Sequence, residues 1–402
     1  MSKKKIKFLH ISYLFHPEMG YDINQFARFL KPDAEMIILA SDKLDLWNIT
    51  SSEIAEKDRA FEIKYGVKII RLPSFKTSSK KAGVFLKGIN STIDAMNPDI
   101  IFYHGIESPT YFYSVWKQCG KRYIAADTHT LFSQFSGISL FGNIYLKLFF
   151  MPILVRKMVK NNCPVFFTAK ENKKVLQWFG FKENRIFNNE ICSDTDLFKY
   201  TPVDPHQLIQ GLLPNGKIIL YTGKFDDFKQ PELIVKAVRL IENKIDFSLN
   251  LVFVGPENKH YTNEKLMIPF SNQNIKVIVL PPVANQSLHQ YYSAADIAIF
   301  PKQNSLSCLD AQSCGIPVVM EEDATNMERL AKGGICYEKG NLKDLAEKLL
   351  ELLINESLRK KLSEEGAAFI KKNFSYGKKM EEIQDWLIAD YKQFKQNKQV
   401  AN

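Results

Sequence analysis

The chain has 402 residues, of which 45% are hydrophobic and 24% charged, and this balance is typical of a globular protein with two or three domains. The formal net charge of +10 and the pI of about 9.0 favour an anionic partner, although a solvated basic surface gives the same charge. Six scattered cysteines, none in a C-x-x-C pair, exclude a zinc motif of that type and a small disulfide framework.

The N-terminal segment reads "MSKKKIKFLHISYLF", a basic tip followed by an apolar run. No small-residue cleavage site follows, and His10, Ser12 and His16 interrupt the run, so the segment does not fit a signal peptide. We interpret it as the approach to a first buried strand. Together with the scattered cysteines, it favours a cytoplasmic location.

Short runs rich in Ile, Val and Phe recur along the chain, separated by stretches with helical periodicity. Apolar strands divided by helices predict parallel sheets that are covered on both faces. The predicted strands of the first half are 6–11, 36–40, 67–70, 100–103, 123–126 and 165–168. Those of the second half are 218–222, 249–254, 277–280, 297–300 and 317–320. Two such series predict an α/β protein with two doubly wound, Rossmann-like domains.

The join between the two series lies in "FKYTPVDPHQLIQGLLPNGK", which contains three prolines and shows little periodicity. An amphipathic helix follows the second series and has an apolar face made of Met380, Ile383, Trp386, Leu387 and Tyr391. We therefore expect one domain at 1–200, a second at 201–375, and a helix at 376–402 that returns to the first domain.

Ligands of doubly wound sheets bind beyond the carboxyl ends of the strands, so the loops there are the candidate sites. Gly223 follows the strand at 218–222, where it permits close approach of the backbone, and Lys224 and Lys229 come next. Two lysines between a strand end and a helix start indicate a phosphate site. Two exposed lysines in an ordinary turn are the alternative. Gly255 marks a second tight turn after the next strand.

A third candidate loop follows the strand at 297–300 and carries Lys302, Ser305, Ser307 and Asp310. The two serines suit the cap of a helix, whose unpaired N–H groups attract an anion, and Lys302 would strengthen such a site. Asp310 lies about one turn into this helix and would reach the hydroxyl groups of a ligand. The alternative is that the serines only cap the helix and Asp310 favours its dipole, which leaves Lys302 unexplained.

The order of these segments resembles the second domain of GT-B glycosyltransferases of the family-four retaining type, the glycosyl transferases group 1. The matching segments are "TGKF", "LVFVGP", "YYSAADIAIFP", "LDAQSCGIPVV" and "NMERL". In the first half, "HPEMGYDINQFARFL" stands where the family has a glycine-rich loop, and "YIAADTHT" where it places a histidine. "NNEICSDTDLF" is similar to the segment before the family's linker. The resemblance spans about residues 5–391.

The resemblance implies that the second domain binds a nucleotide-diphosphate sugar and that the first binds an acceptor, which would be a glycan, a glycolipid or another surface polysaccharide. Lys224 and Lys229 would bind the diphosphate of the donor, and Asp310 the ribose hydroxyls. His129 would lie near the reacting sugar. Without the resemblance, a histidine satisfied at a strand end would be the preferred interpretation of His129.

Further donor-binding residues implied by the resemblance are Gly20, Gly223, Gly255, Lys302, Ser305, Leu306 and Ser307. The backbone N–H groups of residues 305–307 would face the phosphates, and Gly20 would lie where the first loop approaches donor and acceptor. The chain departs from the family at Lys302, which stands where a first glutamate is usual, and at Asp310, which stands where a second glutamate is usual. The lysine reverses the charge beside the transferred sugar.

The resemblance also implies a hexosyl or related transfer with retention, by front-face substitution through an oxocarbenium-like state. Lys224, Lys229 and the helix N-terminus would stabilise the leaving diphosphate. No D-x-D motif lies between the strands of the second series, so we expect transfer without a metal ion and without any other cofactor.

The segment 139–162 combines large apolar residues with Lys147, Arg156, Lys157 and Lys160. We expect Pro152 to break it, and its charge argues against a transmembrane helix. It fits a segment that lies peripherally on an anionic membrane surface. A core helix flanked by basic residues fits equally well.

Two other functions are compatible with the sequence. A non-catalytic accessory subunit of the same fold is favoured by the missing first glutamate. A nucleotide-sugar epimerase would need a cluster of carboxylates and histidines that faces the sugar, and the sequence pattern does not indicate one. Nucleic acid is not an expected partner, because the chain lacks the aromatic and basic motifs of the known binding modules.

Overall fold

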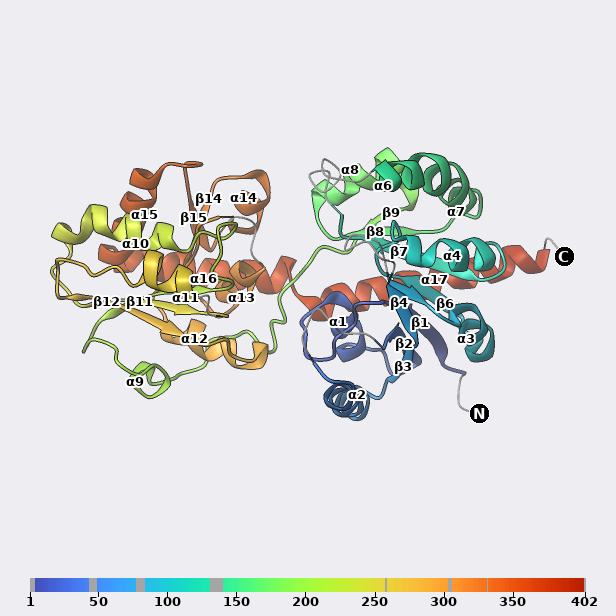
Figure 1. Ribbon diagram of the computed structural model, residues 1–402, viewed down its shortest axis with the longest axis horizontal. Coiled ribbons are helices and arrows are strands. Elements are labelled where there is room, and N and C mark those ends of the chain that lie inside the picture. The colour runs from blue at the N-terminus through green and yellow to red at the C-terminus, as the bar shows by residue number, and fades with distance from the viewer. Residues whose placement is uncertain are drawn as a thin grey trace. The chain divides into compact units, whose positions relative to one another are not determined.

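A computed structural model describes residues 4–42, 49–76, 84–130, 140–256, 259–302, 306–330 and 332–400. The contacts divide the chain into two units (Figure 1). Unit 1 contains the residues up to Ile191 and those from Gly377 onward, and unit 2 contains the residues from Cys192 to Tyr376. Each unit is built around one large parallel sheet, so the predicted pair of doubly wound domains is confirmed.

Unit 1 has a seven-stranded sheet in the order β3-β2-β1-β6-β7-β8-β9, and its paired strands are all parallel. The strands are β1 (Ile6–Ile11), β2 (Ala34–Ser41), β3 (Lys68–Leu72), β6 (Ile100–Tyr103), β7 (Tyr123–Thr128), β8 (Val165–Phe167) and β9 (Ile186–Asn188). A short antiparallel pair, β4 (Ser74–Lys76) and β5 (Val84–Leu86), follows β3. The six strands predicted for this half are confirmed, whereas β9 and the β4–β5 pair were not predicted, because three-residue strands leave no detectable periodicity.

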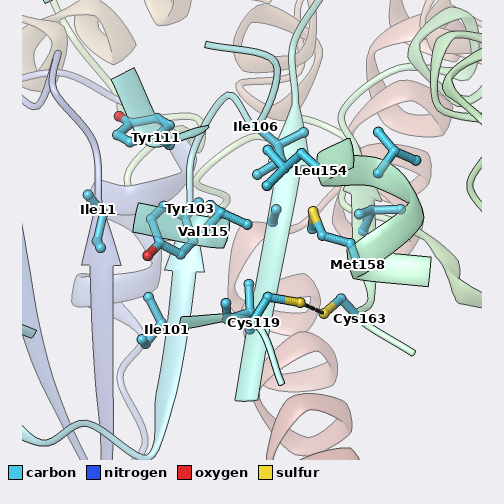
Figure 2. Packing of buried hydrophobic residues seen from close by; sticks show 14 of the residues in the cluster. Ile11, Ile101, Tyr103, Ile106, Tyr111, Val115, Cys119, Leu154, Met158 and Cys163 are labelled. Atoms are coloured by element: carbon cyan, nitrogen blue, oxygen red, sulfur yellow. Dashed lines mark hydrogen bonds between the residues drawn. The ribbon is translucent and has the colours of Figure 1, made fainter. Parts of the chain in front are cut away.

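The helices of unit 1 cover both faces of the sheet (Figure 1). On one face, Phe8 of β1 packs on Phe26 of α1 (Asp22–Arg28), and Phe166 of β8 packs on Trp386 of α17 (Tyr376–Val400). On the other face, Leu9, Ile11, Ile101, Tyr103 and further residues form a buried core with the helices that follow β6, β7 and β8. The helices are α1 (Asp22–Arg28), α2 (Ser51–Tyr65), α3 (Ile89–Met96), α4 (Phe112–Gln118), α6 (Leu140–Ile144), α7 (Arg156–Lys160), α8 (Lys170–Phe179) and α17 (Tyr376–Val400). Figure 2 shows the second core, in which the thiols of Cys119 and Cys163 lie 3.7 Å apart.

The segment 140–160 stays helical through Pro152, which corrects the expectation of a break. Between α6 and α7, residues Tyr145–Val155 form a π-helix. The wider π turn accommodates a residue that has no N–H and whose ring would clash with the preceding turn of an α-helix. Leu146, Phe150, Leu154 and Val155 are buried in the core of unit 1, so the inner side of this segment is structural.

Unit 2 has a six-stranded sheet in the order β12-β11-β10-β13-β14-β15, again parallel throughout. The strands are β10 (Lys217–Thr222), β11 (Leu249–Val254), β12 (Ile275–Leu280), β13 (Ile297–Phe300), β14 (Val318–Glu321) and β15 (Gly334–Tyr337). The main helices are α10 (Glu232–Ile241), α12 (Leu288–Ala294), α13 (Ser307–Ser313), α14 (Ala324–Leu330), α15 (Leu342–Ile354) and α16 (Glu356–Asn373). Shorter helices are α9 (Pro205–Leu208) and α11 (Lys259–Tyr261). The five predicted strands are confirmed, and β15 was not predicted.

Helix α17 is fastened to unit 1 by a buried ion pair. Both guanidinium NH groups of Arg185 contact the carboxylate of Asp390, at 2.5 and 3.0 Å. The hydroxyl of Tyr123 donates to the same carboxylate at 2.6 Å, and Arg185 stacks on Trp386. The two charged side chains are only 12% and 15% exposed. Earlier in the same helix, Asp385 pairs with Lys31 at 2.5 Å but is 60% exposed.

We expect Asp390→Ala to lower the free energy of unfolding by about 3 kcal/mol, because it leaves a buried guanidinium without its partner. Asp385→Ala is the matched control on the same helix, and it should cost less than about 1 kcal/mol because the pair that it breaks is exposed. Urea denaturation followed by tryptophan fluorescence measures both. Equal losses for the two variants would contradict the structural role of the Arg185–Asp390 pair.

Candidate functional site

The candidate loops of unit 2 lie on either side of the point where its strand order reverses, between β10 and β13. In open parallel sheets, this reversal opens a crevice at the carboxyl ends of the strands, where ligands bind. The loop after β10 carries Lys224 and Lys229, and the segment after β13 carries Lys302, Leu306 and Ser307. The fold therefore brings two loops that the sequence singled out separately to the same edge of one sheet.

The turn after β10 brings two backbone segments into close contact. A Cβ atom added to Gly255 would lie 1.9 Å from the carbonyl oxygen of Gly223, so no side chain fits there. Gly223 has a φ of +152°, which L residues rarely adopt. Both glycines are thus required by the geometry of the strand ends, as the sequence predicted for Gly223.

The two lysines of this loop differ in their environment. Lys224 is exposed, whereas Lys229 is half-buried and its backbone N–H donates to Asp226 at 2.9 Å. Burial lowers the pKa of Lys229, with Asp226 opposing this effect and Lys224 adding to it. A partly desolvated ammonium group interacts more strongly with an anion than an exposed one does.

The start of α13 is tied to the end of β10 through one buried hydroxyl group. Tyr292 of α12 shares a hydrogen bond of 2.7 Å with Thr222, and the hydroxyl of Ser307 bonds to it as well. The N-cap of α13 is Leu306 and makes no side-chain capping bond, so the expectation that Ser307 caps the helix is wrong. Ser307 is the first helical residue, and its side chain is engaged with Tyr292. Ser305 lies outside the described residues.

Lys302 is held by a carboxylate from the neighbouring strand. Its ammonium group forms an ion pair with Glu321, the last residue of β14, and both side chains are largely buried. The backbone N–H of Gly340 donates to the same carboxylate oxygen at 2.9 Å. The sequence reasoning missed Glu321. A glutamate that directly follows an apolar strand, at the sheet edge where ligands bind, was the available signal.

Asp310 lies in the first turn of α13 and accepts a hydrogen bond of 2.7 Å from the hydroxyl of Ser193. Burial raises the pKa of Asp310 to about 7, while Ser193 opposes this shift and Asp194 adds to it. The carboxyl group therefore changes its protonation state near neutral pH, where it alternates between hydrogen-bond donor and pure acceptor.

In unit 1, Gly20 is exposed in the loop between β1 and α1, and His129 follows β7 directly. The imidazole Nε2 of His129 lies 3.7 Å from carboxylate oxygens of both Asp22 and Asp127. The sequence reasoning missed these two acids, although Asp127 stands two residues before His129 on the same strand end. Gly20 and His129 belong to unit 1, and the remaining candidates belong to unit 2.

Comparisons with known proteins agree with these features. Residues 207–369 match the family model described as Glycosyl transferases group 1. The D-inositol 3-phosphate glycosyltransferase of Rhodococcus opacus is 25% identical over 241 residues, which cover 56% of this chain and 52% of that protein. The capsular polysaccharide biosynthesis glycosyltransferase CapM of Staphylococcus aureus is 22% identical, over 56% of this chain and 57% of CapM. The chain thus spans about half the length of these two curated relatives.

Solved structures share the whole fold. A glycosyltransferase from Rickettsia africae superposes with a TM-score of 0.74 at 19% identity, covering 98% of this chain and all of that one. Anabaena HepE in complex with UDP superposes with a TM-score of 0.70 at 12% identity, covering 96% of this chain and 100% of HepE. A putative UDP-N-acetylglucosamine 2-epimerase from Listeria monocytogenes reaches 0.60 at 17% identity, with 97% of each chain covered. The family resemblance indicated by the sequence motifs is confirmed.

The pKa of Asp310 predicts a pH-dependent stability of unit 2. The pKa of Asp310 is higher in the folded protein than in the unfolded chain. Protonated Asp310 therefore contributes fully to the free energy of unfolding below about pH 4, and this contribution is lost as the pH rises through about 7. Asp310→Asn cannot ionise, so relative to this variant the wild type should lose stability between pH 5 and pH 8. We expect the difference in thermal midpoint to change by at least about 2 °C.

Differential scanning calorimetry at the two pH values measures this change, with the exposed Asp196→Asn as the control. A pH-independent difference between wild type and Asp310→Asn would show that Asp310 ionises in its ordinary range.

Proposed function

We propose that this chain, a protein of the GT-B fold that carries a group 1 glycosyltransferase domain in residues 207–369, transfers a sugar from a nucleotide-diphosphate sugar to an acceptor. The observation that carries the proposal is the lysine-bearing loop after β10, at the switch point of the domain that matches the family model. Lys224 and Lys229 would neutralise the diphosphate, and the close packing of Gly223 against Gly255 fixes the backbone of the turn that carries Lys224.

The remaining donor contacts are proposed for the segment after β13. Asp310 would bind the ribose hydroxyls, and the backbone of residues 305–307 would face the phosphates. Lys302 would contact the diphosphate or an acidic group of the sugar. Its ion pair with Glu321 supports a role in charge balance, because a carboxylate remains beside the position where relatives carry a first glutamate.

We propose transfer with retention and without a metal ion. The bond from the anomeric carbon to the diphosphate oxygen would break while the acceptor oxygen attacks the same face of the sugar. The acceptor proton would pass to the departing phosphate oxygen, so no side chain has to serve as nucleophile. Lys224 and Lys229 would stabilise the negative charge that develops on the leaving group.

The acceptor class is proposed as a glycan or a lipid-linked glycan of a surface polysaccharide. CapM, which matches more than half of this chain, acts in capsular polysaccharide biosynthesis according to its name. A site at the cytoplasmic face of a membrane is consistent with such an acceptor. Within the part of the chain that the structure describes, no helix has the length and apolar character needed to cross a membrane.

The surface of segment 140–160 supports membrane association. Leu140, Phe141, Leu148 and Phe149 are exposed, and a groove of about 460 Å³ beside them is lined by aromatic side chains that include Phe112. A second groove, of about 640 Å³, is lined by apolar side chains together with Lys147, Arg156 and Lys160. Apolar side chains next to three cations complement the acyl chains and headgroups of an anionic bilayer.

The function is tested by incubating the protein with a panel of nucleotide sugars, with and without glycan and glycolipid acceptors. Release of nucleoside diphosphate that depends on the acceptor would support transfer. A change in the sugar of the donor without any acceptor would indicate an epimerase, whose fold this chain shares. Nucleotide binding without turnover of any donor would indicate an accessory subunit.

We expect Lys229→Ala to weaken binding of a nucleoside diphosphate by about 1.5–3 kcal/mol, because it removes a charge-assisted hydrogen bond from a partly desolvated site. Lys224→Ala should cost less, since Lys224 is exposed. Lys236→Ala, on the outer face of α10, is the control and should leave the affinity unchanged. Isothermal titration calorimetry with UDP, ADP and GDP measures all three. Unchanged affinity in both loop variants would remove these lysines from the site.

We expect the protein to float with vesicles that contain phosphatidylglycerol and to be released by high salt, because each basic residue near an anionic surface contributes about 1 kcal/mol. Phe141→Glu should reduce flotation, since it places a carboxylate on the apolar surface. Ile63→Glu on α2 is the matched control, because Ile63 is also strongly exposed. Equal flotation with neutral phosphatidylcholine, or equal loss in both variants, would assign segment 140–160 to the core alone.

A further inference from the structure

Three side chains from neighbouring strands form a buried hydrogen-bonded chain behind His129. Nδ1 of His10, in β1, lies 2.9 Å from Nε2 of His104, which follows β6. Nδ1 of His104 lies 2.6 Å from Oδ2 of Asp127, at the end of β7. The other oxygen of Asp127 accepts the backbone N–H of Gly105 at 2.8 Å. Asp127 therefore receives two hydrogen bonds that favour its ionised form.

The Nε2 side of His129 faces two carboxylates. Asp127 Oδ1 and Asp22 Oδ2 both lie 3.7 Å from this nitrogen. Asp22 is itself oriented by Asn189, whose side-chain amide donates to Oδ2 at 3.3 Å. Because ionised carboxylates only accept hydrogen bonds, Nε2 has to carry a proton to interact favourably with them.

The Nδ1 side of His129 faces a hydroxyl group whose proton is already used. The side-chain amide NH₂ of Asn172 donates to the carbonyl of Thr130 at 2.7 Å, which turns its Oδ1 toward Thr168. The hydroxyl of Thr168 donates to this Oδ1 at 3.0 Å. Thr168 Oγ1 lies 3.4 Å from Nδ1 of His129, and it has only lone pairs to offer there. Nδ1 has to carry a proton as well.

We propose that His129 is held as an imidazolium by Asp22, Asp127 and Thr168, and that it acts as a fixed cation and hydrogen-bond donor rather than as a proton acceptor. The charge state follows from the contacts within unit 1 alone. The part that this cation takes in sugar transfer rests on the proposed function. Asp22, Asp127 and Thr168 are positioning residues, because they act through His129.

The other groups around the site agree with this assignment. Partial removal from water opposes the charge on His129, but Asp22 and Asp127 raise its pKa to about 10. Burial likewise opposes ionisation of Asp127, yet His104 and His129 lower its pKa. His10 is buried and its pKa is well below the usual value, so it is neutral. Burial raises the pKa of Glu107, whose carboxylate accepts a hydrogen bond from the hydroxyl of Thr130. Among the carboxylates that raise the pKa of His129, Glu107 has a smaller effect than Asp22 or Asp127.

A fixed imidazolium excludes one mechanism and favours another. A general base needs a pKa near the working pH and a free lone pair, and neither is present on His129. A cation that is 46% exposed can instead orient an oxygen-rich ligand of unit 1 and stabilise negative charge that develops on it. The buried pair His10–His104 then serves to keep Asp127 ionised and in place.

NMR of protein labelled with ¹⁵N and ¹³C in histidine tests the charge directly, without any substrate. The ring nitrogens of His129 should show the imidazolium signature from pH 6 to pH 8.5. The exposed His206 and His260 serve as internal references for the ring-nitrogen signals. Titration of the wild-type His129 near pH 6.5, or a single neutral tautomer at pH 7.5, would overturn the proposal.

Asp22→Asn should lower the pKa of His129 by about 1 unit or more, since it removes one of two nearby carboxylates. Thr168→Val should lower it as well, because it removes the acceptor for Nδ1–H, and Asp33→Asn on the surface is the matched control. Asp127→Asn should have a larger effect than Asp22→Asn; if this buried variant does not fold, the Asp22 and Thr168 variants decide. Unchanged titration of His129 in both would contradict the assigned contacts.

Where transfer activity is detected, kcat/KM of the wild type should show no step from His129 between pH 6 and pH 8. In Asp22→Asn a step should appear at the pKa that NMR measures for His129 in this variant, with activity falling as the pH rises through it. Absence of transfer with every donor would count against the proposed function alone, because the NMR result does not depend on turnover.

Discussion

A parallel strand can pair with the next one only after the chain has crossed back over a face of the sheet, and this constraint fixes where both units can bind ligands. Each crossover helix has to be buried against the sheet, so the strands are apolar on both faces and leave no room for a site within the sheet. The polar side chains gather instead at the carboxyl ends of the strands. His104, Asp127 and His129 do so in unit 1, and Lys224, Lys229 and Lys302 in unit 2.

At these strand ends, Lys302 and His129 are each balanced by a carboxylate from another segment of the chain. Lys302 after β13 is paired with Glu321 at the end of β14, and His129 after β7 with Asp22 at the start of α1. A charge that is partly removed from water is stable only with such a partner. The pairing also changes what each group can do chemically. It keeps His129 protonated. It also neutralises the charge of Lys302, which would otherwise repel neighbouring cations.

The same segment can serve the core and the surface. Residues 140–160 bury Leu146, Phe150 and Leu154 in the core of unit 1 while Phe141 and Phe149 face solvent. The two interpretations that the sequence left open, core helix and membrane-interface segment, are therefore compatible. The π-helical stretch makes this possible, because it carries Pro152 without ending the segment.

The sequence by itself determined the fold class, because short apolar runs rich in Ile, Val and Phe, separated by stretches with helical periodicity, indicate buried parallel strands. It also pointed to the loops at 223–229 and 302–310, since glycine, lysine and serine after such a run are local signals, whereas the role of His129 was implied only by the family resemblance. It could not predict β9 or β15, which are too short or too mixed in composition to show a period. It assigned a capping role to Ser307, which the tertiary structure instead engages with Tyr292.

Only the tertiary structure joined Lys302 to Glu321, Asp310 to Ser193, and His129 to Asp22, Asp127 and Thr168. In these pairs, except Asp127 with His129, the partners lie from 19 to 117 residues apart. Their effect on protonation depends on distance and burial, which the order of residues along the chain does not encode locally.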